Sequence, residues 1–518
     1  MQSQTDSVNR FTAKALRDAE DALTVLWKTG TGVVVCIAAA TVAVHLVTGG
    51  RYGFDRDELM ALDDARHLAW GYVAYPPVTP FFARIALILF GTSLVGFRLF
   101  AALAQAVALV LTGLLAKQLG GGKWAQIVAT LAGVPFCLAG GSLMQYISFD
   151  YLCWVLVAYS VAKLLGSQDR RWWLAVGASI GLGMLAKYTM GFLAVGVAAG
   201  ALLTRERRHF RSGWLWGGAL LAVGIFLPNF LWQWHRNFIA WQFLQFIHQR
   251  DVKAGLTDWF LLGQAEVTML ALPLAVAGIC FYLFARNGEQ YRALGWMYLV
   301  PLSLFLLLRG RDYYLAPAYP MLYAGGAVWA EQWLGSLRQE KSRKLRAVVW
   351  AALIADIAIA AAITLPIAPV NSRWWKFASK VNIVFPEEIG WPEFVQTVAL
   401  VRDRLPAGDR ARARILVGNY GEVGALSLYG DKYGLPSAIS GVNSSWERGY
   451  GGPAETFIVA GYPREIVAKH FASCVVAAHA WNKYGVVNEE TMEDPDIFVC
   501  RELKESWTEF WSGMRKFA

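Results

Sequence analysis

The stretch LVGFRLFAALAQAVALVLTGLLA, residues 94–116, carries a single charged side chain, Arg98 near its start. A helix needs about 20 apolar residues to cross the roughly 30 Å hydrocarbon core of a bilayer, and this stretch meets that length. Similar runs occur at about 31–47, 124–140, 150–166, 172–187, 190–204, 213–231, 259–285, 293–308, 313–332 and 347–367. The sequence therefore predicts a polytopic α-helical membrane protein with about eleven transmembrane helices.

The composition agrees with a chain that lies mostly in lipid. Of its 518 residues, 56% are hydrophobic and only 17% are charged, whereas soluble domains carry about a quarter charged residues. The formal net charge of +10 could suit nucleic acid, but Lys and Arg fall in short connectors between apolar runs. A nucleic-acid surface needs basic residues clustered on one face, so we expect no nucleic-acid partner.

The basic connectors predict how the chain is oriented. They are 117–123, 163–171, 205–211, 286–292 and 338–346, whereas the connector 141–149 has neither Lys nor Arg. With alternating helices all five fall on one side, which the positive-inside rule places in the cytoplasm of a bacterial inner membrane. We therefore expect residues 1–30 to be cytoplasmic, residues 31–368 to form the transmembrane domain, and residues 369–518 to be periplasmic.

The first outer loop, residues 49–93, contains RYGFDRDELMALDDARHLAWGYVAYPPVTPFFARI. Apolar and charged residues are mixed from Asp57 to Trp70, which predicts an amphipathic helix at the membrane interface. Trp70, Tyr72 and Tyr75 are suited to anchor this helix at headgroup level. The second long outer segment, 232–258, predicts a further interfacial element.

The C-terminal part, 369–518, alternates short apolar stretches with helical patterns, which predicts a small α/β domain. Its segment Gly418–Gly424 lacks the spacing of a dinucleotide-binding loop and predicts a tight strand-to-helix turn. Cys474 and Cys500 could pair if this part lies outside the cytoplasm, and the sequence leaves that pairing open. The other four cysteines lie in apolar runs and fit core positions.

Asp55, Asp57 and Glu58 place three carboxylates within four residues just after the first span. An ionised carboxylate within reach of an acceptor hydroxyl or amine can act as a general base. A divalent metal is possible, with Asp55 and Asp57 as its ligands. The structural alternative is that Asp55 caps a helix whose first turn carries Asp57 and Glu58, and capping and catalysis can coexist.

Three further groups stand at the outer ends of spans. Arg309 and Arg311 lie on the side that the positive-inside rule disfavours, and a phosphate group would explain them because guanidinium forks match its oxygens. Lys187 could bind phosphate as a point charge. The alternatives are pairing of the arginines with Asp312 or lipid headgroups, and snorkelling of Lys187. Asp150 could cap its helix or face a cavity.

Four segments resemble a known family. FDRDELMALDDARHLAWGYVAYPP, LAKYT, RGRDYYLAPAYP and YGEVGALSLYG…GLPSAISG are similar to the membrane glycosyltransferases of family 39. These belong to the GT-C class, which includes protein O-mannosyltransferases and the lipid A aminoarabinose transferase. The resemblance covers most of the chain and is most specific in the early loop.

The resemblance implies an inverting transferase that moves a sugar from a polyprenyl-phosphate donor to an extracytoplasmic acceptor, which could be a glycolipid, a polysaccharide or a protein. Asp57 matches the proposed catalytic base, with Glu58 beside it and Asp55 in reserve. The residues expected to hold the donor phosphate are Lys187, Arg309, Arg311 and Tyr313.

The resemblance also places Asp150, Tyr75, Tyr314 and His67 in the substrate pocket. One departure concerns Tyr75, because the aminoarabinose transferase has a phosphate-binding lysine before its paired prolines. Another cation would have to replace that lysine, or the donor would have to lie differently.

Two other classes of protein compete with a transferase. A secondary transporter would need charges near the bilayer midplane, inverted repeats and broken helices. A flippase or scaffold for lipid-linked sugars would leave the acidic cluster without a role. The polar clusters at outer helix ends and the lack of a repeat in the sequence favour the transferase.

Overall fold

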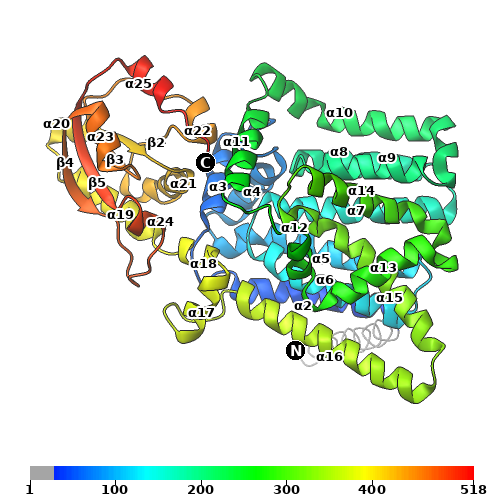
Figure 1. The fold of residues 1–518 in the computed structure, drawn as a ribbon. Helices are drawn as coiled ribbons and strands as arrows, with labels where there is room; N and C mark the ends of the chain where they lie inside the picture. Colours follow the sequence, from blue (N-terminus) through cyan, green and yellow to red (C-terminus); the bar gives the residue numbers. More distant parts are fainter. Residues whose placement is uncertain (1–28) are drawn as a thin grey trace, which may run out of the picture.

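The computed structural model describes residues 29–518, so the predicted cytoplasmic segment 1–30 lies almost wholly outside the described residues. A bundle of apolar helices forms one part of the molecule, and a small sheet domain lies at one end of the bundle (Figure 1). This is the predicted division into a helical membrane part and a C-terminal α/β part.

Every predicted span corresponds to a helix. Within the described residues, those long and apolar enough to cross a membrane are α2 (Gly30–Thr48), α5 (Leu94–Gln118), α6 (Lys123–Ser142), α7 (Tyr146–Ser167), α10 (Gly213–His235), the pair α12–α13 (Phe260–Phe284) and α16 (Gln339–Thr364). The remaining predicted spans are shorter apolar helices, α8 (Trp172–Ala186), α9 (Met190–Leu202), α14 (Arg292–Leu307) and α15 (Tyr319–Gly335).

One span is interrupted. The 3-10 turn η2 (Met269–Ala271) separates α12 (Phe260–Thr268) from α13 (Leu272–Phe284), and Met269 has a φ of 46°. The break frees a backbone donor, and buried Asp356 of α16 accepts the hydrogen bond from the Leu270 N–H at 3.2 Å. This intramembrane carboxyl therefore has a structural role, because an unsatisfied backbone group in lipid is costly.

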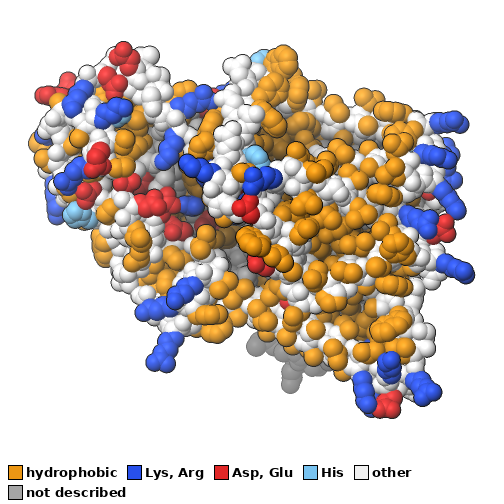
Figure 2. Space-filling view, in the orientation of Figure 1, with side chains coloured by type: hydrophobic (Ala, Val, Ile, Leu, Met, Phe, Trp, Pro, Cys, Tyr) orange, Lys and Arg blue, Asp and Glu red, His pale blue; other side chains and the backbone are white. Residues whose placement is uncertain are grey.

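Lys and Arg side chains gather along the edge of the bundle that faces away from the sheet domain (Figure 2). The basic connectors meet at one end: Gln290 donates to the Leu165 carbonyl at 2.6 Å, and Tyr291 donates to the Gln118 carbonyl at 2.9 Å. Apolar side chains cover most of the face of the bundle that Figure 2 shows. The bundle thus has one basic end, as the connectors predicted, and its cytoplasmic placement stays a prediction.

The first outer loop forms the predicted helix, but the surroundings of that helix differ from the prediction. It forms α3 (Arg56–Arg66) and α4 (Val78–Phe90), but α3 is covered by α21 (Tyr420–Tyr429) of the sheet domain instead of lying open at the interface. Tyr72 and Tyr75 are each only 3% exposed and do not anchor at headgroup level, whereas Trp70 is 58% exposed. An amphipathic pattern predicts a buried face, and that face can be covered by protein as well as by lipid.

The connecting elements are short. At the basic end lie η1 (Arg205–Arg211) and η3 (Arg286–Tyr291), and at the sheet-domain end lie α11 (Ile239–Lys253) and η4 (Asp312–Ala318). After α16, a linker with α17 (Arg373–Val381) and α18 (Val384–Glu387) leads to the sheet domain.

The C-terminal domain is the predicted α/β domain, built on one five-stranded sheet of order β2-β1-β3-β5-β4. Its strands are β1 (Arg414–Val417), β2 (Ala438–Ile439), β3 (Thr456–Ala460), β4 (Phe471–His479) and β5 (Asp496–Leu503). Strand β1 is parallel to β2 and β3, and β5 is antiparallel to β3 and β4. Its helical elements are α19 (Trp391–Asp403), α20 (Ala407–Arg412), α21, η5 (Gly430–Tyr433), α22 (Asn443–Glu447), α23 (Arg464–His470), α24 (Glu489–Met492) and α25 (Trp507–Gly513).

The two cysteines of this domain form a disulfide. Cys474 of β4 and Cys500 of β5 are opposite each other in the antiparallel ladder, and their sulfur atoms are 2.17 Å apart. The pairing that the sequence left open is therefore present in the structure.

Candidate active site

The acidic cluster of the first outer loop opens helix α3. Asp55 is the N-cap residue, and its carboxylate accepts a hydrogen bond from the Asp57 N–H at 2.9 Å. The Glu58 carboxylate accepts a hydrogen bond from the Asp55 N–H at 3.0 Å, which completes a capping box. The structural alternative considered for Asp55 therefore holds.

Glu58 is fully buried and pairs with the guanidinium of Arg98 from α5. Arg98 Nη2 lies 2.6 Å from Glu58 Oε2, and the Met144 N–H donates to Glu58 Oε1 at 2.8 Å. Arg98 also pairs with Glu388 of the linker at 2.7 Å. Both oxygens of Glu58 are occupied, so its predicted catalytic role has no support in this geometry, and Glu58 fixes α3 to the bundle instead.

Asp57 is the acidic residue of α3 that stays partly exposed. Its Oδ2 accepts a hydrogen bond from Gln145 Nε2 at 3.2 Å, and the Tyr420 hydroxyl of α21 interacts electrostatically with it. Burial raises the pKa of the Asp57 carboxyl; the charge of Arg56 and the nearby Tyr420 hydroxyl lower it, and Glu58 adds to the increase. A carboxylate whose pKa is moved toward neutrality is well matched to general-base work.

Lys187 lies among three tyrosine rings. It follows the last residue of α8, and its ammonium nitrogen is 5.2 Å from the ring centroid of Tyr146, 5.2 Å from that of Tyr313 and 4.5 Å from that of Tyr314. The negative faces of aromatic rings stabilise a cation at such distances. Lys187 is thus directed into the protein and does not snorkel toward lipid headgroups.

Asp150 faces Lys187 and the tyrosine rings around it. Helix α7 begins at Tyr146, so Asp150 lies in its second turn and does not cap it. The fully buried Asp150 carboxylate accepts hydrogen bonds from Trp154 Nε1 at 3.1 Å and from Thr189 Oγ1 at 3.4 Å, and it interacts electrostatically with Lys187. Of the two sequence-based alternatives for Asp150, the structure has the inward-facing one.

The two predicted arginines differ in their surroundings. Arg311 pairs with buried Asp251 at 3.3 Å and lies over the Tyr313 ring, and within residues 29–518 its buried Nε has no hydrogen-bond partner. Arg309 is half exposed and pairs with Asp258 at 2.6 Å. Arg311 therefore belongs to the tyrosine cluster, and Arg309 lies at its margin.

Gln145 and Tyr146 join the acidic and the cationic groups. Gln145 donates to Asp57, and the next residue, Tyr146, places its ring over Lys187. The Tyr146 hydroxyl interacts electrostatically with both Asp57 and Arg311. The early acidic loop and the late arginine segment, some 250 residues apart in sequence, thus meet at one place.

The remaining predicted residues lie at different distances from this place. Tyr75 donates to the buried Asp64 carboxylate at 2.7 Å, and its ring centroid is 6.1 Å from that of Tyr146, so it forms part of the site's wall. His67 caps the far end of α3 and its ring bonds to the Asp63 carbonyl at 2.9 Å. The described contacts do not join His67 to the cluster.

The candidate metal ligands do not form a full set. Within residues 29–518, the structure has no group of three or more His, Cys, Asp or Glu side chains arranged to hold a metal ion. Asp55 and Asp57 would supply two ligands, and Asp55 is already occupied as a helix cap.

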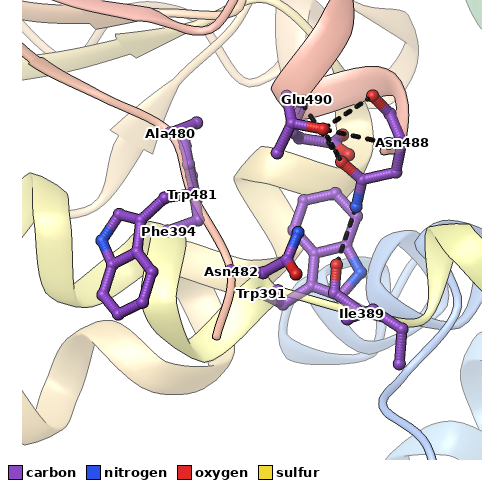
Figure 3. Close-up of a pocket in the computed structure, with 10 residues that line it drawn as sticks. Ile389, Trp391, Phe394, Ala480, Trp481, Asn482, Asn488 and Glu490 are labelled. Atoms are coloured by element: carbon purple, nitrogen blue, oxygen red, sulfur yellow. Dashed lines mark hydrogen bonds between the residues drawn. The ribbon is translucent and has the colours of Figure 1, made fainter. Parts of the chain in front are cut away.

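Two cavities lie in the sheet domain. Figure 3 shows a pocket in which Asn488 donates a hydrogen bond to the Ile389 carbonyl at 2.8 Å. Its volume of about 10 Å³ leaves room for roughly one water molecule. The other, about 600 Å³, lies where β1 and β3 begin, whereas Tyr420 follows the opposite end of β1. Neither cavity contains the residues of the acidic and cationic site.

Sequence reasoning gave no role to Gln145, Tyr146, Tyr420 or Asp251. Neutral amides and tyrosines in an aromatic-rich chain carry no charge signal. Tyr420 lies in one of the segments that carry the family resemblance, and this was the available signal. Asp251 could have been found as a possible partner for the arginines on the same side.

The fold and site define a class: a polytopic membrane protein with a C-terminal α/β domain, in which the partly buried Asp57 carboxylate lies near the Lys187 cation and the tyrosine rings around it. Residues 74–232 match the family described as dolichyl-phosphate-mannose-protein mannosyltransferase. No curated protein matches the sequence.

Solved structures place the fold more narrowly. ArnT from Cupriavidus metallidurans bound to undecaprenyl phosphate matches with a TM-score of 0.59 at 16% identity, covering 91% of this chain and 98% of that one. The apo state of the same protein gives 0.58 at 14% identity with the same coverage. The chain has the GT-C fold of membrane glycosyltransferases.

Proposed function

We propose that this protein is an inverting glycosyltransferase that moves a sugar from a polyprenyl-phosphate donor to an acceptor in the cell envelope. The observation that carries the proposal is the position of Gln145 and Tyr146, which link the Asp57 carboxylate to the Lys187 and Arg311 cations. A transferase with a phosphate leaving group needs a base on the acceptor side and positive charge on the leaving-group side.

The proposed step uses Asp57 as the base. The Asp57 carboxylate takes the proton from an acceptor hydroxyl or amine as the acceptor atom attacks the anomeric carbon of the donor sugar. The bond between that carbon and the phosphate oxygen breaks, its electron pair stays with the phosphate, and the configuration at the carbon inverts. The proton on Asp57 then passes to solvent, which returns the carboxylate for the next turnover.

The cationic group stabilises the leaving phosphate. Lys187 and Arg311 supply positive charge where negative charge develops, and the unpaired Nε of Arg311 is available as a hydrogen-bond donor. Tyr313 and Tyr314 hold Lys187 in place. Asp251 and Asp150 neutralise part of this charge, which lets the phosphate leave after transfer.

The membrane context supports a lipid-linked donor. The isoprenoid chain would lie among the apolar helices, so that only the headgroup meets polar side chains. Undecaprenyl phosphate is bound in the ArnT structure of the same fold, which supports a carrier of this class. The basic end of the bundle supports a site on the periplasmic side of a bacterial inner membrane, opposite the cytoplasm.

The test is turnover by the purified full chain in detergent. Undecaprenyl-phosphoryl mannose and undecaprenyl-phosphoryl aminoarabinose serve as donors, an envelope extract supplies acceptors, and release of undecaprenyl phosphate is measured. Asp57→Asn should lower the rate about 10²- to 10⁴-fold while binding of undecaprenyl phosphate is unchanged. Asp403→Asn, at an exposed position of α19 within the sheet domain, is the matched control.

The outcomes separate the classes. A wild-type rate in Asp57→Asn would refute the base assignment. Transport of donor across a proteoliposome membrane, without release of undecaprenyl phosphate, would favour the transporter or flippase alternative.

A further inference from the structure

The site is completed by a side chain from outside the bundle. Tyr420 is the first residue of α21 in the sheet domain, and its hydroxyl interacts electrostatically with Asp57 in the first outer loop. The Arg56 guanidinium carbon lies 5.8 Å from the centre of the Tyr420 ring, so the ring is held on its other flank. The two residues that meet here are 363 positions apart in sequence.

Helix α21 is built to lie close to α3. A Cβ atom on Gly424 would overlap the Leu59 carbonyl oxygen of α3, and one on Gly421 would meet Arg56 and Trp391. Two glycines three residues apart occupy one face of a helix, so they let the backbones of α21 and α3 approach closely. This approach brings the Tyr420 hydroxyl within reach of Asp57.

The start of α21 is fixed independently of Asp57. Asn419 caps the helix by accepting a hydrogen bond from the Glu422 N–H at 2.9 Å, and Glu422 accepts one from the Asn419 N–H at 3.1 Å. The Asn419 amide also donates to Glu490 at 3.3 Å. Glu490 lines the pocket of Figure 3, and its neighbour Glu489 pairs with Arg56.

We propose that Tyr420 is a positioning residue for the transfer reaction: the sheet domain supplies a hydroxyl that orients the Asp57 carboxylate toward the acceptor. Gln145 donates to Asp57 Oδ2 from the bundle, and the Tyr420 hydroxyl approaches the same carboxyl from the sheet domain. Two contacts from different domains fix the plane of a carboxylate better than one. The inference rests on the proposed function, because it assumes that Asp57 is the base.

The position of Tyr420 in the sheet domain also makes activity depend on how that domain docks on α3. Arg448 pairs with Asp63 and Asp64 of α3, and Arg66 of α3 pairs with Asp431 at 3.2 Å. These contacts hold the sheet domain on α3. Loss of docking would therefore withdraw the Tyr420 hydroxyl from the site even if the bundle stayed folded.

The test compares Tyr420→Phe with wild type in the full chain, using undecaprenyl-phosphoryl mannose or its aminoarabinose counterpart, whichever donor turns over. Removing a polar contact to a charged group should lower kcat about tenfold and leave KM for the donor unchanged. The acidic limb of the pH profile should move to higher pH, because the Tyr420 hydroxyl favours the ionised form of Asp57. Tyr433→Phe, in η5 of the same domain, is the matched control and should behave as wild type.

Other charged and titratable groups also act on Asp57. The shift of the pH profile is therefore measured as the difference between Tyr420→Phe and wild type. These other groups are Asp55, Arg56 and Glu58 on α3, Tyr75 on the following loop, and Tyr146 on α7. All of them are unchanged in Tyr420→Phe.

Each outcome decides the inference. A wild-type kcat and pH profile in Tyr420→Phe, with Asp57→Asn inactive, overturns it and leaves the proposed function standing. Loss of thermal stability with an unshifted profile also overturns it, because Tyr420 would then be only structural. Full activity of Asp57→Asn instead refutes the base assignment itself.

Discussion

Arg98→Met should be among the most damaging single substitutions outside the catalytic groups. Arg98 is 3% exposed and donates to Glu58 at 2.6 Å, to Glu388 at 2.7 Å and to the Gly49 and Gly53 carbonyls at 2.9 and 3.0 Å. The substitution leaves two buried carboxylates without a cation. Breaking a buried ion pair from one side costs about 3–5 kcal/mol, and the lost carbonyl contacts add to this cost.

Glu388→Gln should raise the stability of the folded protein at high pH, whereas Arg98→Met lowers it. Burial raises the pKa of Glu388 to about 7, against the charge of Arg98 and with a smaller contribution from Glu58. Since the unfolded value is about 4.3, the folded state keeps the Glu388 proton to higher pH. The stabilising contribution of the Glu388 proton is complete below pH about 4.3 and is lost as pH rises through about 7, a total of roughly 4 kcal/mol.

Glutamine does not titrate, so Glu388→Gln should match wild type at pH 5 and exceed it at pH 8. Thermal unfolding of the detergent-solubilised protein, followed by tryptophan fluorescence at both pH values, measures the difference. We expect the Tm of Glu388→Gln at pH 8 to lie roughly 3–6 °C above wild type, and that of Arg98→Met to lie below it by at least as much. Adding Glu388→Gln to Arg98→Met should recover part of the loss, because one carboxylate instead of two is then unpaired. If Glu388→Gln destabilised the protein at pH 8 as strongly as Arg98→Met does, the reasoning about burial would be wrong.

Two further predictions concern the donor site and the domain contact. Lys187→Met and Arg311→Gln should each weaken binding of undecaprenyl phosphate about tenfold or more, because each removes a partly buried positive charge proposed to contact the phosphate. Arg309→Gln, at the exposed margin, should change binding less than threefold; equal effects at Arg309 and Arg311 in a titration would contradict the placement of the donor. Gly424→Val should separate the sheet domain from the bundle by forcing a side chain against Leu59. Trypsin should then cleave the linker around α17 and α18 faster than in wild type, and unchanged cleavage would show that the contact tolerates the added volume.

The membrane fold was predictable because lipid imposes a simple rule on the sequence. Every stretch long and apolar enough to span forms a helix, and the basic connectors share one end of the bundle. The predicted spans 172–187 and 190–204 match α8 and α9 to within two residues, although these helices have only 15 and 13 residues and are shorter than the roughly 20 residues needed to cross a bilayer.

The site was only partly predictable because charge patterns identify ions but not their partners. Asp57, Lys187 and Arg311 stood out as charges at membrane boundaries, and the structure places them around Gln145 and Tyr146. Glu58, one residue from Asp57, carries the same charge in the same loop. Only the position of Arg98 in space makes one carboxylate structural and leaves the other partly open.

The division between Glu58 and Asp57 follows from the geometry of α3. Adjacent helical residues point about 100° apart, so the side chain of Glu58 enters the bundle toward Arg98 while that of Asp57 faces the space between Gln145 and Tyr420. The same helix must therefore be held firmly on one face to keep a base in place on the next. The buried Glu58–Arg98–Glu388 group provides that hold and also ties in the linker that leads to the sheet domain. Because Tyr420 comes from that domain, one ion-pair group fixes the base and its positioning partner together.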